Sequence, residues 1–292
     1  MHDYLRAVGF SSVKRKKDME ELIQYVVSKC SESIMIPVAS DCKLEQCNKD
    51  FGPSFGITVV GEYDENDIFR PDHCFPYCVG QYITQEESIG IKKIADKEAY
   101  SGFCDDDNLG CSMIFFLQNI MDYVKNCWSN VPEMGYRSVR LGALSVDGSI
   151  ILGCEKSAED YADKTQFKEF RKRELRRAKE GDAKAAELLA MQEMETYALI
   201  ANRLDMREDV YTIVDTTFMP YGVECDQYTI MGTIISIHKY INIYSFEEVW
   251  VLALECNDII ITVCINDKDL LGEPMVGRRF KGTIWLQGYV EM

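Results

Sequence analysis

The sequence predicts an α+β protein with an N-terminal α+β domain, a charged helical hairpin or arm, and a small C-terminal antiparallel β-barrel. Three observations lead to this organisation. Residues 1–155 mix helical and extended patterns, residues 156–208 are dense in charge and in good helix formers, and residues 209–292 alternate polar and apolar side chains. The length of 292 residues also suits two domains with a helical insert between them.

Two helices are expected in the N-terminal domain. The acidic residues Asp18, Glu20 and Glu21 precede apolar residues at helical spacing, which predicts a helix at about 16–30. A second apolar series with helical spacing predicts a core helix over Cys111–Lys125.

Short strands are expected between these helices. They are predicted at Phe55–Glu62, Gln81–Thr84 and Ile89–Ile94. The dipeptide Asp147-Gly148 accepts positive φ in a tight turn, so a hairpin is expected between Val139–Val146 and Ser149–Leu152. Helices that interrupt short antiparallel strands are typical of an α+β domain.

The helical arm spans residues 156–208. Gly181 breaks its helical pattern, and Asp182 can cap a second helix that carries apolar residues along one face up to Leu204. Two helices separated at this point would form a hairpin or a kinked arm.

The C-terminal segment predicts an OB-like barrel of five strands. Strands are expected at Tyr228–Ile237, Val249–Glu255, Ile259–Ile265 and Gly277–Val290, with the fifth supplied by Val210–Thr216. Asn257-Asp258 predicts a tight turn, and Lys268–Leu271 predicts a helical turn. The core of this barrel is expected to need Ile234, Val263 and Trp285.

Composition restricts the partners of the protein. Its formal net charge of -16 argues against broad binding to nucleic acids or anionic membranes. The apolar run Met113–Leu117 ends at Gln118 and Asn119, too short for a bilayer span, and no secretory signal is recognised, so a cytoplasmic protein is expected. The 12 cysteines should then remain reduced thiols.

A zinc site would draw on His73, Cys74 and Cys78, with Cys42 and Cys47 as further ligands. Their spacing does not form the two tight pairs of a structural zinc site, so no metal and no cofactor are predicted. The acidic residues Glu62, Asp64, Glu65, Asp67 and Asp105–Asp107 lack the spacing of a calcium loop. We interpret them as solvated acidic loops.

A thiol nucleophile would combine Cys104 or Cys111, near the start of the expected helix, with His73 as the base. The acidic run Asp105–Asp107 disfavours a thiolate at this point, and the chain has only 3 histidines. The catalytic residues therefore stay unknown.

The stretch Lys168–Glu180 is the strongest basic feature, with seven basic residues against three acidic ones. An Arg-rich helix can bind phosphates, but docking on the acidic N-terminal domain or exposure to solvent accounts for the same residues. Aromatic rings of the barrel could stack on bases or sugars, but core packing is favoured, because the local charge is acidic: Tyr228, Tyr240, Tyr244, Trp250, Trp285 and Tyr289.

Four segments resemble a known bacterial family of the Clostridia type, the domain of unknown function numbered 3881. They are MHDYLRAVGFS at 1–11, AYSGFCDDDNLGCSMIFFLQN at 99–119, DTTFMPYGVECDQYTIMGTI at 215–234 and RFKGTIWLQGYV at 279–290. The family has no assigned activity, cofactor or catalytic residue, so the resemblance implies a single bacterial cytoplasmic protein and no site.

Three functions remain open. A non-enzymatic cytoplasmic binding or scaffold protein that contacts a protein partner is favoured, because no catalytic signature is present. An enzyme with a thiol or carboxylate site in the N-terminal domain is the first alternative. Nucleic-acid binding through the Arg-rich helix 168–180 is the second.

Overall fold

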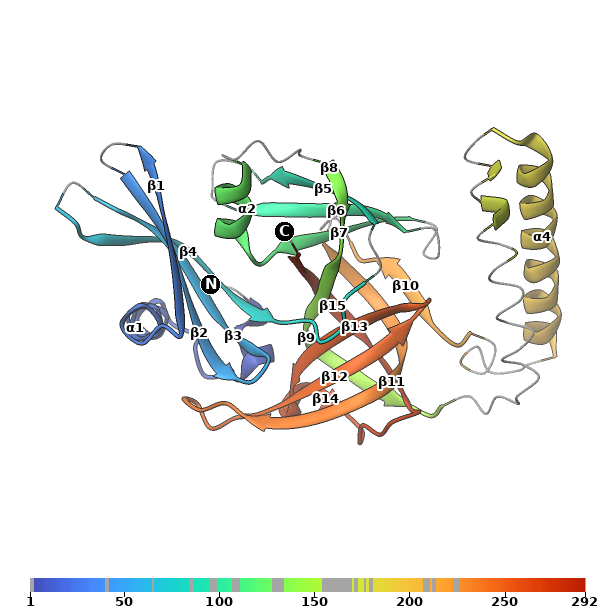
Figure 1. Ribbon diagram of the computed structural model, residues 1–292. Coiled ribbons are helices and arrows are strands. Elements are labelled where there is room, and N and C mark those ends of the chain that lie inside the picture. The colour runs from blue at the N-terminus through green and yellow to red at the C-terminus, as the bar shows by residue number, and fades with distance from the viewer. Residues whose placement is uncertain are drawn as a thin grey trace.

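The computed structural model describes residues 3–39, 42–64, 66–84, 87–94, 99–106, 111–127, 134–153, 170, 173–175, 177–178, 181–206, 211, 214–222 and 226–291. The protein mixes α and β structure, with many strands and few helices. Figure 1 shows a four-stranded sheet on the left, a larger body of strands in the centre, and a long helix on the right.

The first sheet is an antiparallel meander in the order β1-β2-β3-β4. Its strands are β1 (Glu32–Ala39), β2 (Cys42–Gly52), β3 (Phe55–Tyr63) and β4 (Phe69–Cys78). The 3-10 helix η1 (Asp3–Val8) precedes α1 (Lys16–Ser28), which packs against β2 and β3. The predicted helix at 16–30 and the predicted strand at 55–62 are both confirmed.

A second group of strands continues into the large sheet in the order β7-β6-β5-β8. It consists of β5 (Glu87–Lys93), β6 (Tyr100–Asp106), β7 (Cys111–Leu117) and β8 (Met134–Arg137), with α2 (Ile120–Cys127) between the last two in sequence. The predicted strand at 89–94 is confirmed as β5. The strand expected at Gln81–Thr84 is reduced to one isolated bridge at Ile83.

The helix predicted over Cys111–Lys125 is wrong in its first half, where the chain forms β7. This strand is buried on both faces: Phe115 belongs to the core around the barrel, and Phe116 to the core of the first sheet. A strand buried on both faces has no polar alternation, so its apolar residues also match a helical spacing.

Five strands close a barrel: β9 (Val139–Ile151), β11 (Gln227–Ile241), β12 (Glu248–Cys256), β13 (Ile259–Asn266) and β15 (Arg279–Val290). All neighbours are antiparallel except β13 and β9, which are parallel. Three short elements lie against the barrel strands: β10 (Thr217–Pro220), η2 (Asp267–Asp269) and β14 (Leu270–Leu271). The predicted turn at Asn257-Asp258 is confirmed, since both residues have positive φ, 50° and 68°.

The hairpin predicted around Asp147-Gly148 is wrong, because β9 runs through it as one strand. Gly148 does not take the positive φ of a tight turn, and a Cβ there would lie 2.4 Å from the Phe280 ring. Its lack of a side chain instead lets the strand pass close to the barrel core. The barrel therefore takes its fifth strand from β9. The described residues within Val210–Thr216, the segment expected to supply it, form no strand.

The barrel core contains Ile234 and Val263, as predicted, both at 0 % exposure. Trp285 is also buried, at 5 %, but it faces out of the barrel and belongs to the core of the first sheet. Its ring lies 5.5 Å from that of Tyr4 and 5.1 Å from that of Phe116. Trp285 thus joins the barrel to the N-terminal part of the protein.

The arm contains α4 (Ala183–Asp205), which stands apart from the central body (Figure 1). The predicted cap is confirmed, because Lys184 N donates to Asp182 Oδ1 at 3.0 Å. Within the part of the chain that the structure describes, no helix has the length and apolar character to span a membrane.

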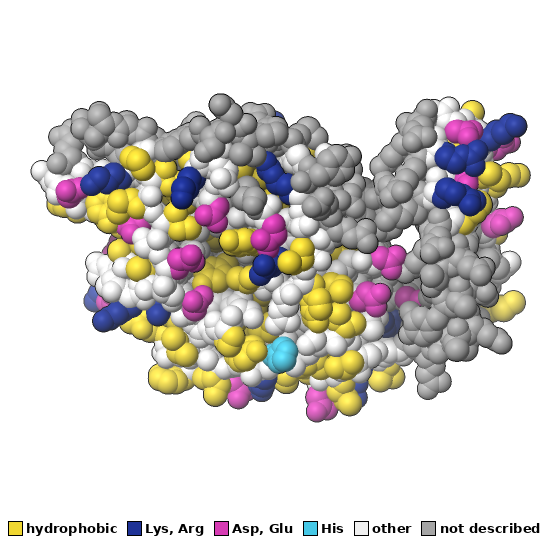
Figure 2. Space-filling view, viewed as in Figure 1, with side chains coloured by type: hydrophobic (Ala, Val, Ile, Leu, Met, Phe, Trp, Pro, Cys, Tyr) yellow, Lys and Arg dark blue, Asp and Glu magenta, His cyan; other side chains and the backbone are white. Residues whose placement is uncertain are grey.

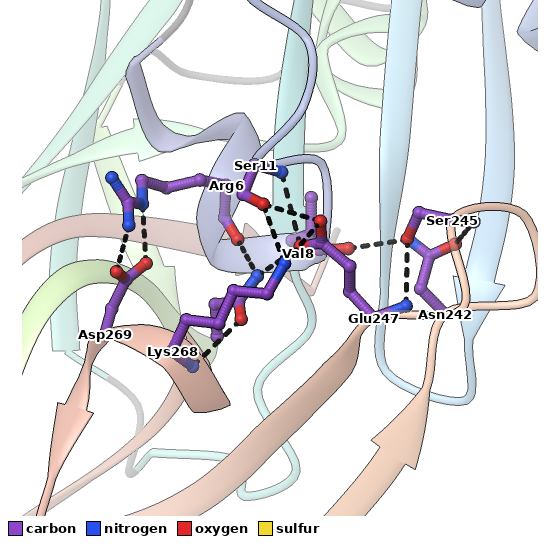
Figure 3. A network of polar contacts seen from close by, with 9 residues as sticks. Arg6, Val8, Ser11, Asn242, Ser245, Glu247, Lys268 and Asp269 are labelled. Atoms are coloured by element: carbon purple, nitrogen blue, oxygen red, sulfur yellow. Dashed lines mark hydrogen bonds and ion pairs between the residues drawn. The ribbon is translucent and has the colours of Figure 1, made fainter.

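The N-terminal segment is held on the barrel by side chains that bind its backbone (Figure 3). Asn242 Nδ2 donates to the carbonyl of Val8 at 2.7 Å, and Asn266 Nδ2 donates to the carbonyl of Arg6 at 3.0 Å. The Arg6 guanidinium also pairs with Asp269. Both amides are fully buried, so these bonds fix the position of η1.

Glu247 is the centre of the same network. It accepts hydrogen bonds from Ser11 Oγ at 2.5 Å, from Asn266 Nδ2 at 2.6 Å and from Lys268 Nζ at 2.9 Å. Partial burial opposes ionisation, but the bonds from Ser11, Lys268 and Asn266 outweigh it and lower the pKa of Glu247.

Substitution of Trp285 tests the connection between the barrel and the N-terminal part. Removal of a buried large aromatic side chain typically costs about 3 to 5 kcal/mol, so Trp285→Ala should lower the free energy of unfolding by that order. Chemical denaturation measures it. Tyr197→Ala, at a side chain 71 % exposed, is the control and should change little. Equal effects of the two substitutions would contradict the packing described.

Glu247 predicts a pH dependence of stability. The pKa of Glu247 in the folded protein lies below the ordinary 4.5. The ionised carboxylate therefore adds to the free energy of unfolding above pH 4.5, and this stabilisation is lost as the pH falls through the folded pKa. Wild type should therefore be more stable than Glu247→Gln at pH 7, and the difference should shrink below pH 4.5. Urea denaturation across this range measures it. Glu273→Gln, at an exposed site, is the control: its difference in stability from wild type should not change with pH in this range.

Candidate functional site

A polar pocket of about 140 Å³ lies between the first sheet, the start of α2 and the end of β15. Three kinds of polar side chain line it. They are the carboxylates Glu32, Asp50 and Asp122, the amides Gln46, Asn48, Gln118 and Asn119, and the hydroxyls Thr58, Tyr77 and Tyr289. The pocket is the site that we consider for function.

One face of the first sheet supplies most of these groups. Side chains two residues apart on a strand share a face, so Gln46, Asn48 and Asp50 project together from β2. In register, Glu32 on β1 is opposite Asn48, and Asn48 is opposite Thr58 on β3. Thr58 Oγ1 donates to Asn48 Oδ1 at 2.8 Å.

Gly56 allows Tyr77 to reach across the sheet. It lies between Asp50 on β2 and Tyr77 on β4 in the register of the strands. A Cβ at Gly56 would lie 2.4 Å from the Tyr77 hydroxyl, so the ring passes over the space that a side chain would fill. Tyr77 Oη then donates to Asp50 Oδ1 at 2.5 Å.

Gln118 is one of the residues that line the pocket, and it is 5 % exposed. Its Nε2 donates to the carbonyl of Cys78 at 2.8 Å and to Gln287 Oε1 at 2.9 Å. Both partners are acceptors, so the orientation of the amide is determined. Gln118 Oε1 is consequently a buried acceptor, and it has no hydrogen-bond partner within the described structure.

Two neighbouring amides of the pocket, Asn119 and Gln46, are also hydrogen-bonded to the backbone. Asn119 donates to the carbonyl of Val290 at 2.8 Å and accepts from its N–H at 3.1 Å. Gln46 donates to the carbonyl of Gln118 at 3.2 Å and accepts from the N–H of Met121 at 3.3 Å. Three elements distant in sequence, β2, α2 and β15, are therefore connected next to the pocket.

The charged side chains that line the pocket are all acidic. Burial raises the pKa of the Tyr289 hydroxyl, and Asp122, Glu291 and Glu32 raise it further. Burial and the hydrogen bond to Asp50 likewise raise the pKa of Tyr77. The residues that line the pocket include no Lys, Arg or His. Such a site favours a ligand that donates hydrogen bonds and carries no negative charge.

The candidate zinc ligands that the structure describes on β4 do not converge. His73 and Cys74 are consecutive on β4 and point to opposite faces of the sheet. Cys78 lies inside the core, where Cys264 Sγ contacts its Sγ at 2.8 Å. Among the described residues, no three His, Cys, Asp or Glu side chains converge on a metal position. The side chain of Cys42 lies outside the described part of the structure.

The candidate nucleophiles lie on strands, Cys104 on β6 and Cys111 on β7, so neither has the helix N-terminus that was expected to lower its pKa. The side chain of Cys111 is outside the described set. Burial raises the pKa of the Cys74 thiol to about 11 and that of the Cys47 thiol to about 12, which disfavours a thiolate at either position.

In the acidic loop after β3, the carboxylate of Asp64 binds the loop backbone. Asp64 accepts hydrogen bonds from the N–H groups of Asn66 at 2.9 Å and Ile68 at 3.1 Å, and it pairs with Arg70. The bonds from Ile68, Arg70 and Asn66 lower the pKa of Asp64. Glu65, Asp107 and the side chains of Asp105 and Asp106 lie outside the described residues.

In the described part of the Arg-rich stretch 168–180, the arginine side chains form ion pairs with acidic residues close by in sequence. Glu174 is buried and lies 3.0 Å from Arg173 and 2.8 Å from Arg177, which also pairs with Asp182 at 2.6 Å. Lys168, Arg171, Lys172, Arg176 and Lys179 lie outside the described residues.

The barrel aromatics are divided between core and surface. Tyr228 and Trp285 are buried, and Trp250 Nε1 donates to Asp267 at 2.7 Å. Tyr289 is the member that lines the pocket. The sequence motifs do not predict this pocket, although the alternating polar residues 46, 48 and 50 and the polar pair after Leu117 are signals of it.

Comparison with known proteins assigns the chain to a family. Residues 5–288 match the model described as "Domain of unknown function, E. rectale Gene description (DUF3881)", so the chain belongs to this family. No curated protein and no solved structure matches it.

Substitution of Gly56 tests the geometry of the pocket wall. In Gly56→Ala, the new Cβ would meet the Tyr77 ring and the carbonyl of Lys49, which a Cβ would approach to 2.3 Å. Such overpacking typically costs about 1 to 3 kcal/mol, measured by chemical denaturation. Gly135→Ala is the control, because its Cβ would have no neighbour closer than 3.8 Å. If Gly56→Ala left the free energy of unfolding unchanged, the close approach of Tyr77 would be contradicted.

Proposed function

We propose that this protein is a non-enzymatic binding protein that holds a small, hydrogen-bond-donating molecule in the polar pocket. The observation that carries the proposal is Gln118 Oε1, a buried acceptor without a hydrogen-bond partner among the described residues, on a side chain that lines the pocket together with three carboxylates. An unsatisfied buried polar group typically costs about 1 to 3 kcal/mol, and a ligand that donates to it would recover this cost.

Binding without chemistry is favoured over catalysis by the state of the candidate reactive groups. Burial raises the pKa of the thiols of Cys47, Cys74 and Cys256, which disfavours the thiolate that a nucleophile needs. The hydroxyls of Tyr77 and Tyr289 also have raised pKa values. An enzyme that uses a pocket carboxylate is the alternative, and conversion of a bound compound would identify it.

We further propose an OB-like barrel in a bacterial cytoplasmic protein. Support for the barrel type comes from the β11-β12-β13 meander, closed by β15 and by the parallel contact of β9 with β13. Support for the compartment comes from the free thiols of six described cysteines, Cys30, Cys47, Cys74, Cys78, Cys256 and Cys264.

A protein partner is the second candidate function, and the arm favours it. Four large apolar side chains of α4 are between 45 and 73 % exposed: Leu188, Met191, Met194 and Tyr197. Figure 2 shows hydrophobic side chains exposed along the arm beside Lys and Arg. A partner that binds this helix should be lost from affinity capture with Met191→Glu/Met194→Glu and retained with a pocket variant. Nucleic-acid binding has less support, because Arg173 and Arg177 already pair with Glu174.

The ligand-binding proposal predicts a specific effect of Asp122→Asn. Native mass spectrometry of the whole chain with a panel of polyols, sugars, amino acids and amines should identify a bound compound. A hydrogen bond to a charged group is worth about 1.5 to 3 kcal/mol, so the substitution should weaken binding roughly tenfold or more. Glu273→Gln, outside the pocket, is the control. Binding that Asp122→Asn leaves unchanged, or no binding of any compound, would contradict the proposal.

A further inference from the structure

We propose that the pocket ligand is a small organic amine whose ammonium group binds between Gln118 and Asp122. This inference rests on the proposed function and names the chemical class of its ligand. It follows from the charge of the pocket, from its excess of acceptors and from its size.

Charge is the first argument. The pocket presents three carboxylates and no basic side chain among its lining residues. Arg140, whose guanidinium lies 6.0 Å from the ring of the pocket residue Tyr289, is already in an ion pair with Glu291 at 2.6 Å. A cationic ligand would therefore compensate the charge of the carboxylates that line the pocket.

The second argument is the balance of donors and acceptors. Among the residues that the structure describes, Gln118 Oε1 has no hydrogen-bond partner, and the hydrogen bond found for the Asp122 carboxylate is a long contact of 3.4 Å from Tyr289 Oη to Oδ2. Tyr77 occupies one oxygen of Asp50. An ammonium group brings three donors and no acceptor, whereas a hydroxyl brings one donor and lone pairs that would face carboxylates. The ammonium group matches these surroundings better.

An inorganic cation fits the site less well. Ca²⁺ takes about six to eight oxygen ligands, often from several carboxylates, and Mg²⁺ needs a nearly ideal octahedral site. Within the described residues no three acidic side chains converge on a metal position, and the pocket carboxylates come from three different elements, β1, β2 and α2. Asp122 is half-buried, whereas Glu32 and Asp50 are exposed. This arrangement suits a molecule with some length.

Size limits that molecule. The pocket volume of about 140 Å³ is below the roughly 300 to 1,000 Å³ of sites for drug-sized ligands. A short aliphatic diamine is of suitable size. One ammonium group would contact Gln118 and Asp122, and the other would lie toward Glu32 and Asp50.

Isothermal titration calorimetry with two matched probes tests the inference. The probes are 1,4-diaminobutane and 1,4-butanediol, which share a carbon chain and differ in charge. The diamine should bind wild type, more weakly at high salt, and the diol should show no binding. Asp122→Asn should weaken diamine binding roughly tenfold. Glu32→Gln, at an exposed position, should weaken it less without affecting folding, and Glu273→Gln should leave it unchanged.

The outcomes separate this inference from the proposed function. If the diol or another neutral compound binds in the pocket and the diamine does not, the inference that the ligand is an amine is wrong, whereas the proposed binding function is retained. Binding of Mg²⁺ or Ca²⁺ that Asp122→Asn abolishes, without amine binding, identifies a metal site and overturns the inference. If no amine and no neutral compound binds, both proposals fail. Diamine binding that Asp122→Asn and Glu32→Gln leave intact also overturns the inference.

Discussion

The buried amide pair of Gln118 and Gln287 determines how the parts of this protein meet. Gln287, on β15 of the barrel, accepts from the N–H of Cys78 at 3.1 Å and donates to the carbonyl of Pro76 at 2.8 Å. Gln118 donates to Gln287 and to the carbonyl of Cys78. One pair of side chains thus joins the end of β4, the start of α2 and the barrel. The pocket exists because these elements meet there.

Aromatic rings around this pair contribute the apolar part of the same junction. Phe116 lies 4.7 Å from the ring of Phe75, and Trp285 contacts both Phe116 and Tyr4. Burial of large rings supplies most of the free energy of such a contact, but it is not directional. The amide pair is directional, since each of its hydrogen bonds requires one position of the partner strand. Together they fix the first sheet on the barrel.

Features that depend on neighbouring residues were predictable from the sequence. The helix at 16–28, the cap at Asp182 and the turn at Asn257-Asp258 each follow from a few adjacent side chains. The errors concern contacts between distant segments. β7 was interpreted as a helix because both of its faces are buried. β9 was divided at Gly148 because nothing nearby in sequence shows that Phe280 and β13 lie against it.

The pocket was not predictable for the same reason. The alternation of Gln46, Asn48 and Asp50 is visible in the sequence, but alternating polar residues also describe an ordinary solvent-facing strand. Only the register of the sheet places Tyr77 over Gly56 and next to Asp50. Tyr289 comes from a strand at the other end of the chain. The chemistry of the site is thus produced by the junction and not by a local motif.

The unsatisfied oxygen of Gln118 is a direct consequence of its structural role. The junction needs the two N–H groups of this amide, and an amide that supplies them also carries a carbonyl oxygen that requires a donor. An apolar residue at position 118 would remove the unpaired oxygen but would also leave the carbonyl of Cys78 and the oxygen of Gln287 each without this donor. A ligand that donates to Gln118 would complete the network without that loss. Because such a ligand binds only the folded junction, its binding energy would add to the stability of the contact between the first sheet and the barrel.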